Sequence, residues 1–209
     1  KPAEETTANN KKDEVVGSWT ISNTSGGCII KKYYGSEAEV IIPDNINGKT
    51  VVEIGDNAFR NNNEIRRVVI PNSVASIGVS AFYDCNFLNS VSLPENLVSI
   101  KERAFASCNS LEDITIPDSV TVIGNEAFEY CTSLKTMLLP DSVTEICNGA
   151  FSECSDLASI TIPESVVTIG DEAFESCSSL TNITLPSSIT KINANTFSYS
   201  GLESIKIPD

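Results

Sequence analysis

Cysteine offers the widest choice of chemistry in this chain, since seven thiols could form disulfides, bind metal or act as nucleophiles. Thiolate zinc sites need closely spaced pairs such as C-x-x-C, and the sequence has none. Stacked repeats would place neighbouring Cα atoms about 5 Å apart, within disulfide range, but parallel Cβ vectors suit a disulfide poorly. We therefore expect a ladder of buried thiols that act as small hydrophobic groups and weak S–H donors. Its members recur every 23 residues: Cys85, Cys108, Cys131, Cys154 and Cys177.

The other polar residues give little support to catalysis or metal binding. The chain has no histidine, which excludes Ser-His and Cys-His nucleophile pairs and imidazole metal ligands. Acidic residues such as Asp118 and Asp141 follow successive prolines and could gather Ca²⁺, but calcium needs several oxygens that converge from one loop. We expect these carboxylates to be solvated turn residues. The sequence thus predicts no catalytic residue, no metal site, no cofactor and no enzyme activity.

Net charge narrows the class of partner. The 209 residues carry 28 acidic and 14 basic side chains, for a net charge of −14 at pH 7. Nucleic acids and anionic membranes are disfavoured as partners, because both require clustered Lys and Arg. No apolar run approaches the roughly 18 residues of a transmembrane helix, so we expect no direct membrane insertion. A protein ligand is the remaining expectation.

A second periodic residue predicts the elements that would position these groups. Phenylalanine recurs at the same interval of 23 residues. A fixed period in this range indicates a solenoid in which each repeat forms one coil. We expect the rings to point inward and to stack into one aromatic spine. The spine residues are Phe59, Phe82, Phe105, Phe128, Phe151, Phe174 and Phe197.

Each coil carries two apolar segments separated by a proline. The first segment, L-x-x-I-x-L-P, predicts a strand with Leu111, Ile114 and Ile116 facing inward in one copy, and the proline ends that strand. The second segment is short and β-branched, as in Val143 and Ile146, and predicts a second short strand on a different face.

A corner is expected after the second segment. Glycine tolerates positive φ, so its recurrence there predicts positive φ in those copies, although Lys101 and Cys147 break the column. The motif A-F-x-x-C that follows predicts one turn of helix or 3₁₀ helix on the outer side. The corner glycines are Gly55, Gly78, Gly124 and Gly170.

Composition divides the chain into three regions. Residues 1–14 are polar and lack aromatics, which predicts a leader or tether. Residues 15–42 lie outside the repeat and predict two or three strands that cap the open end of the solenoid. Residues 43–209 predict a solenoid of about seven coils, the last incomplete, with an extra turn at Asn47-Gly48.

The outward positions of the first strands form the candidate binding face. They are small, rich in hydroxyl groups and only partly charged. A Thr- and Ser-rich surface is also what an exposed β-sheet ordinarily carries, so the binding and structural interpretations both stay open. The candidate residues are Arg66, Arg67, Asn89, Ser90, Ser92, Glu112, Asp113, Thr115, Lys135, Thr136, Leu138, Ser159, Thr161, Asn182 and Thr184.

The unit L-x-x-I-x-L-P-x-S-V-x-x-I-G-x-x-A-F-x-x-C resembles the BspA-type leucine-rich repeat of bacterial surface proteins, over about residues 40–209. The resemblance implies a leucine-rich-repeat solenoid whose parallel β-sheet takes one strand from each coil. Second short strands and helical or 3₁₀ turns would lie on the other faces, behind a β-rich N-terminal cap. The family supplies no catalytic residues to carry over.

The same resemblance implies an extracellular or bacterial cell-surface location, with a lipid anchor as one means of attachment. It also implies adhesion, through binding to host matrix or surface proteins. The alternative is a structural spacer that displays another domain beyond Asp209. The oligomeric state is left open.

Overall fold

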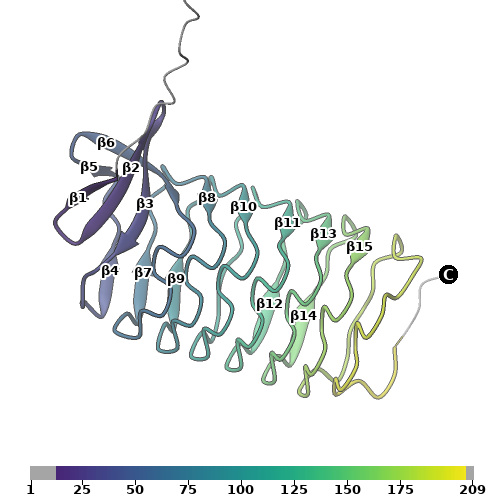
Figure 1. Ribbon diagram of the computed structural model, residues 1–209. Helices are drawn as coiled ribbons and strands as arrows, with labels where there is room; N and C mark the ends of the chain where they lie inside the picture. Colours follow the sequence, from purple (N-terminus) through teal and green to yellow (C-terminus); the bar gives the residue numbers. More distant parts are fainter. Residues whose placement is uncertain (1–12, 206–209) are drawn as a thin grey trace, which may run out of the picture.

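Apolar side chains recur at the same positions of every coil, and their burial winds the chain into a parallel β-solenoid (Figure 1). The computed structural model describes residues 13–205, so all but the last two residues of the predicted leader (1–14) and the chain's last four lie outside it. The predicted solenoid of 23-residue coils is confirmed. Residues 13–205 include no helix with the length and hydropathy of a membrane span.

The second apolar segment of each coil builds the longer of the two main sheets. Its strands pair in parallel with a constant register, so that Ile100 lies beside Ile123 and Ile123 beside Ile146. The ladder continues beyond the strands, because Cys147 N donates to Ile123 O at 2.9 Å. In order, the strands are β6 (Lys49–Ile54), β8 (Ser76–Ile77), β10 (Ser99–Ile100), β11 (Val122–Ile123), β13 (Glu145–Ile146) and β15 (Thr168–Ile169).

The first apolar segment builds a less regular sheet on the other side of the coils (Figure 1). Within residues 13–205 the copy at 113–115 forms no strand, so the shorter second strands make the continuous sheet. Aspartate is a poor strand former, which accounts for the interruption beside Asp113. The paired strands are β4 (Glu39–Ile41), β7 (Arg67–Val69) and β9 (Ser90–Ser92), and then β12 (Thr136–Leu138) with β14 (Ser159–Thr161).

The phenylalanine rings fill the core between the two sheets. Neighbouring rings from Phe82 to Phe197 have centroids 5.2–5.6 Å apart and planes within 6° of parallel. All the rings from Phe59 to Phe174 are fully buried, whereas Phe197 is partly buried. Both sheets therefore pack against one continuous aromatic column.

An antiparallel cap covers the N-terminal end of this column. Trp19 packs on Tyr33 with ring centroids 4.6 Å apart, and Tyr33 packs on Phe59 at 5.2 Å. The cap's last strand pairs in parallel with β6, which closes an edge that would otherwise be free to aggregate. Its strands are β1 (Glu14–Val16), β2 (Trp19–Thr24) and β3 (Gly27–Tyr33).

The predicted extra turn at Asn47-Gly48 is a β-hairpin. Strand β5 (Asn45–Ile46) pairs with the start of β6 in antiparallel fashion. Asn47 and Gly48 both have positive φ, at 51° and 76°, as a tight hairpin turn requires.

The A-F-x-x-C segment forms successive turns instead of the predicted helical turn. Glu129 N donates to Glu126 O, and Cys131 N donates to Phe128 O, each at 3.1 Å. Glu126 and Tyr130 have φ of 52° and 57°, and the equivalent positions keep positive φ in every other coil. Left-handed residues at this spacing prevent a continuous helix.

The prediction of positive φ at the corner glycines is wrong. Positive φ falls two residues later, for example at Glu126 and Glu172. Glycine is favoured because the preceding coil lies too close for a side chain: a Cβ built on Gly124 would lie 2.8 Å from Ile100 O. At Gly170 the nearby backbone is that of Cys147, whose carbonyl carbon would lie 2.7 Å from the Cβ.

Candidate functional site

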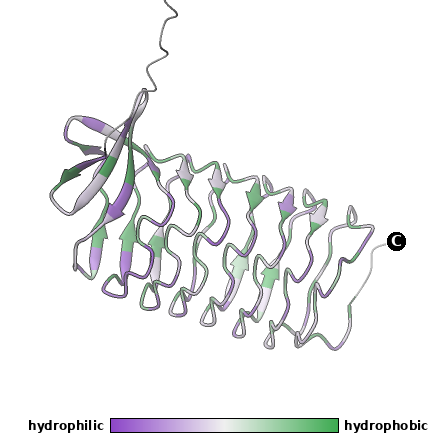
Figure 2. Ribbon diagram, in the orientation of Figure 1, coloured by the Kyte–Doolittle hydropathy of each residue, from purple (hydrophilic) through white to green (hydrophobic). Residues whose placement is uncertain are grey.

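The first sheet presents the predicted binding-face residues on one surface. Strand register aligns them in columns, with Arg67 beside Ser90 and Thr136 beside Ser159. All of them are exposed except Ser90, which is half-buried. Figure 2 shows hydrophilic residues at the ends of β4 and β7 next to hydrophobic ones, as alternating inward and outward side chains require.

Charges on this face are partly neutralised by neighbouring coils. Lys135 Nζ lies 2.7 Å from Glu112 Oε2, and Arg67 Nε lies 3.3 Å from Glu39 Oε1. The hydrogen bond from Lys135 lowers the pKa of Glu112. The carboxylate of Asp113 forms no ion pair or hydrogen bond with another side chain of residues 13–205.

Exposed apolar side chains on and beside this face were not singled out from the sequence. The predicted face has no aromatic residue, yet Phe87 is half-exposed at its margin, where the Arg66 guanidinium lies 5.5 Å from the ring centroid. Ile41 and Leu138 are each 69% exposed on the sheet itself. The signal for all three was an apolar residue at a position that is polar in most other copies.

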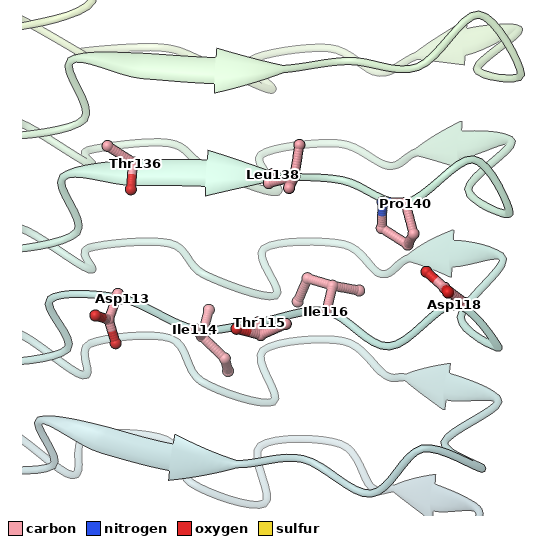
Figure 3. A pocket seen from close by; sticks show the side chains of 8 residues that line it. All are labelled: Asp113, Ile114, Thr115, Ile116, Asp118, Thr136, Leu138 and Pro140. Atoms are coloured by element: carbon pink, nitrogen blue, oxygen red, sulfur yellow. The ribbon is translucent and has the colours of Figure 1, made fainter.

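A groove of about 360 Å³ opens on this face between two consecutive coils (Figure 3). Residues 113–116 make no backbone hydrogen bond to the coil on either side, although Lys135 N still donates to Glu112 O at 3.1 Å. The coils are therefore less tightly joined here than at β12 and β14, where three residue pairs are in register. The lining residues are Asp113, Ile114, Thr115, Ile116, Asp118, Thr136, Leu138 and Pro140.

A second groove of about 290 Å³ has the same origin. It lies between β14 and the next coil, where residues 160–162 face residues 182–184. The predicted face residues Thr161, Asn182 and Thr184 line it. Gaps in strand pairing thus give the face its relief.

The repeated cysteines lie in the core. Each thiol donates to the carbonyl of the phenylalanine in the preceding coil, as Cys85 Sγ does to Phe59 O at 3.1 Å and Cys108 Sγ to Phe82 O at 3.2 Å. Burial raises the pKa of all five thiols, to about 12 for Cys85 and Cys177. None of the seven cysteines is in a disulfide, so the ladder tethers neighbouring coils through weak hydrogen bonds.

An acidic hollow of about 240 Å³ lies over the turns of successive coils. Glu126, Glu129 and Glu172 are among its lining residues, and Arg103 pairs with Glu126. Partial burial, followed by the negative charge of Glu126, raises the pKa of Glu129 to about 7. No group of three or more Cys, Asp or Glu side chains within residues 13–205 has an arrangement that could hold a metal ion.

These features define the class of protein: a repeat solenoid with an exposed, grooved sheet face, whose polar core groups bond to the backbone. The chain matches the model of the BspA type Leucine rich repeat region in six copies, over residues 52–155 and 99–209. It belongs to the BspA-type leucine-rich repeat family, as predicted. Solenoids of this kind are typically protein-interaction scaffolds.

Solved structures of bacterial leucine-rich repeat proteins share this fold. A leucine rich cell surface protein from Faecalibacterium prausnitzii A2-165 is 36% identical with a TM-score of 0.82, over 93% of this chain and 54% of that one. The Treponema pallidum (T. pallidum) leucine-rich repeat protein is 32% identical with a TM-score of 0.70, over 81% and 91%. A protein from Bacteroides ovatus ATCC 8483 is 28% identical with a TM-score of 0.72, over 95% and 60%. No curated protein matches the chain.

Proposed function

We propose that the chain is a secreted or cell-surface binding module that mediates protein–protein contact, in particular adhesion to host or neighbouring-cell proteins. The observation that carries this proposal is the grooved face of the first sheet, where exposed polar side chains surround exposed Leu138. A rigid column of stacked coils holds this face in a fixed shape, which reduces the entropy lost on binding.

The surface location is supported by a family relation. The Faecalibacterium prausnitzii protein is described as a cell surface protein, and this chain matches 54% of its length at 36% identity. A lipid anchor is one means by which such a module would be held at the cell envelope. Protease treatment of intact cells, followed by immunoblotting, tests the location: the chain should be degraded while a cytoplasmic marker survives.

A spacer that displays another domain is the second candidate. It is favoured by the observation that the chain spans only 54% and 60% of two of the solved relatives, which are longer proteins. The two functions differ in where a ligand binds. A spacer leaves the sheet face without a partner, and any ligand would bind the displayed domain.

Biolayer interferometry against a panel of purified extracellular-matrix and cell-surface proteins tests the binding function. We expect at least one of these proteins to bind the full chain with a Kd of roughly 1 µM to 1 mM, as for a transient contact. Leu138→Asp should weaken that interaction, because it places a charge at an apolar position of the face.

The matched control is Val167→Asp, at an exposed valine that follows the central residues of the opposite sheet's coil segment. It changes charge and hydropathy in a similar way and should leave binding unchanged. Equal loss in both variants would indicate a nonspecific charge effect. No binding by any protein of the panel would count against adhesion and favour the spacer.

A further inference from the structure

We propose that the groove between residues 113–118 and 136–140 binds an extended segment of a partner protein in which one apolar side chain lies between two cationic ones. This inference rests on the proposed function, since it names the partner chemistry of the same sheet face. Three properties of the groove carry it: an exposed apolar wall, two carboxylates without partners, and the charge of the surrounding coils.

The apolar wall is specific to this pair of coils. Leu138 is 69% exposed, whereas the same column holds Thr115 in the coil before and Thr161 in the coil after. Figure 3 shows Leu138 and Pro140 along one side of the groove, opposite the row formed by residues 114–116. An apolar ligand group at this point would remove Leu138 from water, which favours binding.

Two carboxylates mark the ends of the groove. Figure 3 shows Asp113 and Asp118 at opposite ends of the row of lining residues. Neither carboxylate forms an ion pair or hydrogen bond with another side chain of residues 13–205. Five residues of extended chain separate them by at most roughly 16 Å. Each is therefore free to pair with a cationic group of a ligand.

The coils around the groove are the most acidic part of the molecule. Residues 102–175 carry 14 acidic and two basic side chains, so they hold most of the net charge of −14. A field of this sign speeds the approach of a basic segment and repels an acidic one. Charge complementarity thus selects a Lys- or Arg-bearing partner over a neutral one.

Groove length favours an extended ligand. In an extended chain, residues i, i+2 and i+4 point to the same side and span about 13 Å, which Lys side chains can extend to reach both carboxylates. The backbone N–H and C=O groups of residues 113–116, which make no hydrogen bonds to the neighbouring coils, offer further polar contacts. The matching pattern is Lys-x-Leu-x-Lys.

Fluorescence anisotropy with a labelled peptide, Gly-Lys-Ser-Leu-Ser-Lys-Gly, tests this assignment on the full chain. We expect saturable binding with a Kd below roughly 1 mM that weakens as salt is added. Asp113→Asn with Asp118→Asn should weaken binding by about 2- to 20-fold, the range for two exposed charge pairs. Leu138→Thr, which introduces the residue of the adjacent coils, should weaken it by about fivefold.

Matched controls separate the groove from the general field. Glu102→Gln with Asp156→Asn removes the same charge from exposed sites outside the groove, and Val167→Thr removes an exposed valine whose column holds Thr144 in the coil before. Both should leave the Kd within about twofold, the size of a weak exposed interaction. Circular dichroism and thermal unfolding of each variant should match the parent.

Several results would overturn the assignment. One is equal binding of peptides in which Glu replaces both Lys residues or Gly replaces Leu. Another is an equal effect of the groove and control variants. A change of oligomeric state in the groove variants, measured by light scattering, would assign the groove to a second copy of the chain. If a panel protein binds while the peptide does not, the binding function stands and only the groove assignment fails.

Discussion

At the scale of single residues, the same side chain can serve the coil or the surface, and burial decides which. The repeated cysteines bond to backbone carbonyls inside the core, whereas Asp113 and Leu138 point outward without partners. The sequence was sufficient to predict the thiol contacts in kind, because identical residues at a fixed period must stack. It could not identify Leu138 as exceptional, since a leucine on a strand usually faces the core.

The thiol ladder should be unreactive in the folded protein. Burial raises the pKa of Cys108, Cys131 and Cys154 well above the ordinary value, so almost no thiolate forms at pH 8. Titration with a thiol reagent such as DTNB should label none of the five ladder cysteines in native buffer and all seven thiols of the chain in guanidinium. Rapid native labelling of the ladder would contradict the assigned burial.

Removing a central ring should destabilise the whole column. Phe128 is fully buried between Phe105 and Phe151, with centroids 5.6 and 5.5 Å away. Phe128→Ala should lower the free energy of unfolding by about 3–5 kcal/mol, measured by urea denaturation. Phe197→Ala, at the partly buried end of the stack, should cost less, and exposed Phe87→Ala should change stability by only about 0.5 kcal/mol. Similar losses in all three variants would exclude a load shared through the stack.

Stability should depend on pH through Glu129. Its folded pKa of about 7 lies above the ordinary glutamate value of about 4.3, so the folded state binds more protons between these values. Stability from this group therefore rises as pH falls from about 8 to 5. Glu129→Gln should raise stability at pH 8 by up to about 1 kcal/mol and flatten that part of the pH profile. An unchanged profile in urea denaturation would contradict the pKa shift.

At the scale of elements, the order of the two strand segments was predicted correctly, but their relative regularity was not. The short second segment forms the continuous sheet because each strand is fixed by the corner that follows it. The corner itself was predicted from glycine, yet its cause is the close approach of the preceding coil. Contacts between coils are absent from the local sequence pattern, so positive φ was placed two residues too early.

Alanine substitutions distinguish the two kinds of corner glycine. A Cβ on Gly170 would lie 2.5 Å from Asn148 N, so Gly170→Ala must displace backbone and should cost about 1–3 kcal/mol. Gly149 has φ of 60° at a position where Glu126 and Glu172 occur in other coils. Gly149→Ala should therefore cost no more than about 1–2 kcal/mol, the strain of one left-handed residue. Thermal unfolding would contradict this account if Gly149→Ala were the more harmful change.

At the scale of the whole molecule, periodicity determines the architecture, and departures from periodicity determine the candidate surface. The solenoid, its family and its buried columns follow from the period of 23 residues. The groove exists because the coil at 113–116 does not pair like its neighbours, and no residue count reveals a missing ladder. The N-terminal cap lies between these cases: its strands were expected, whereas the packing of Trp19 and Tyr33 on the aromatic column was not.

Hydrogen–deuterium exchange of the full chain, alone and with a panel protein that binds it, tests the central claim most directly. The amides of residues 113–116 make no hydrogen bonds to neighbouring coils, so they should exchange fast in the free protein. On binding, exchange should slow at residues 112–118 and 136–140 and stay unchanged at β11 and β13 of the opposite sheet. Protection confined to the opposite sheet, or no protection on the solenoid at all, would contradict the assignment of the grooved face as the binding surface.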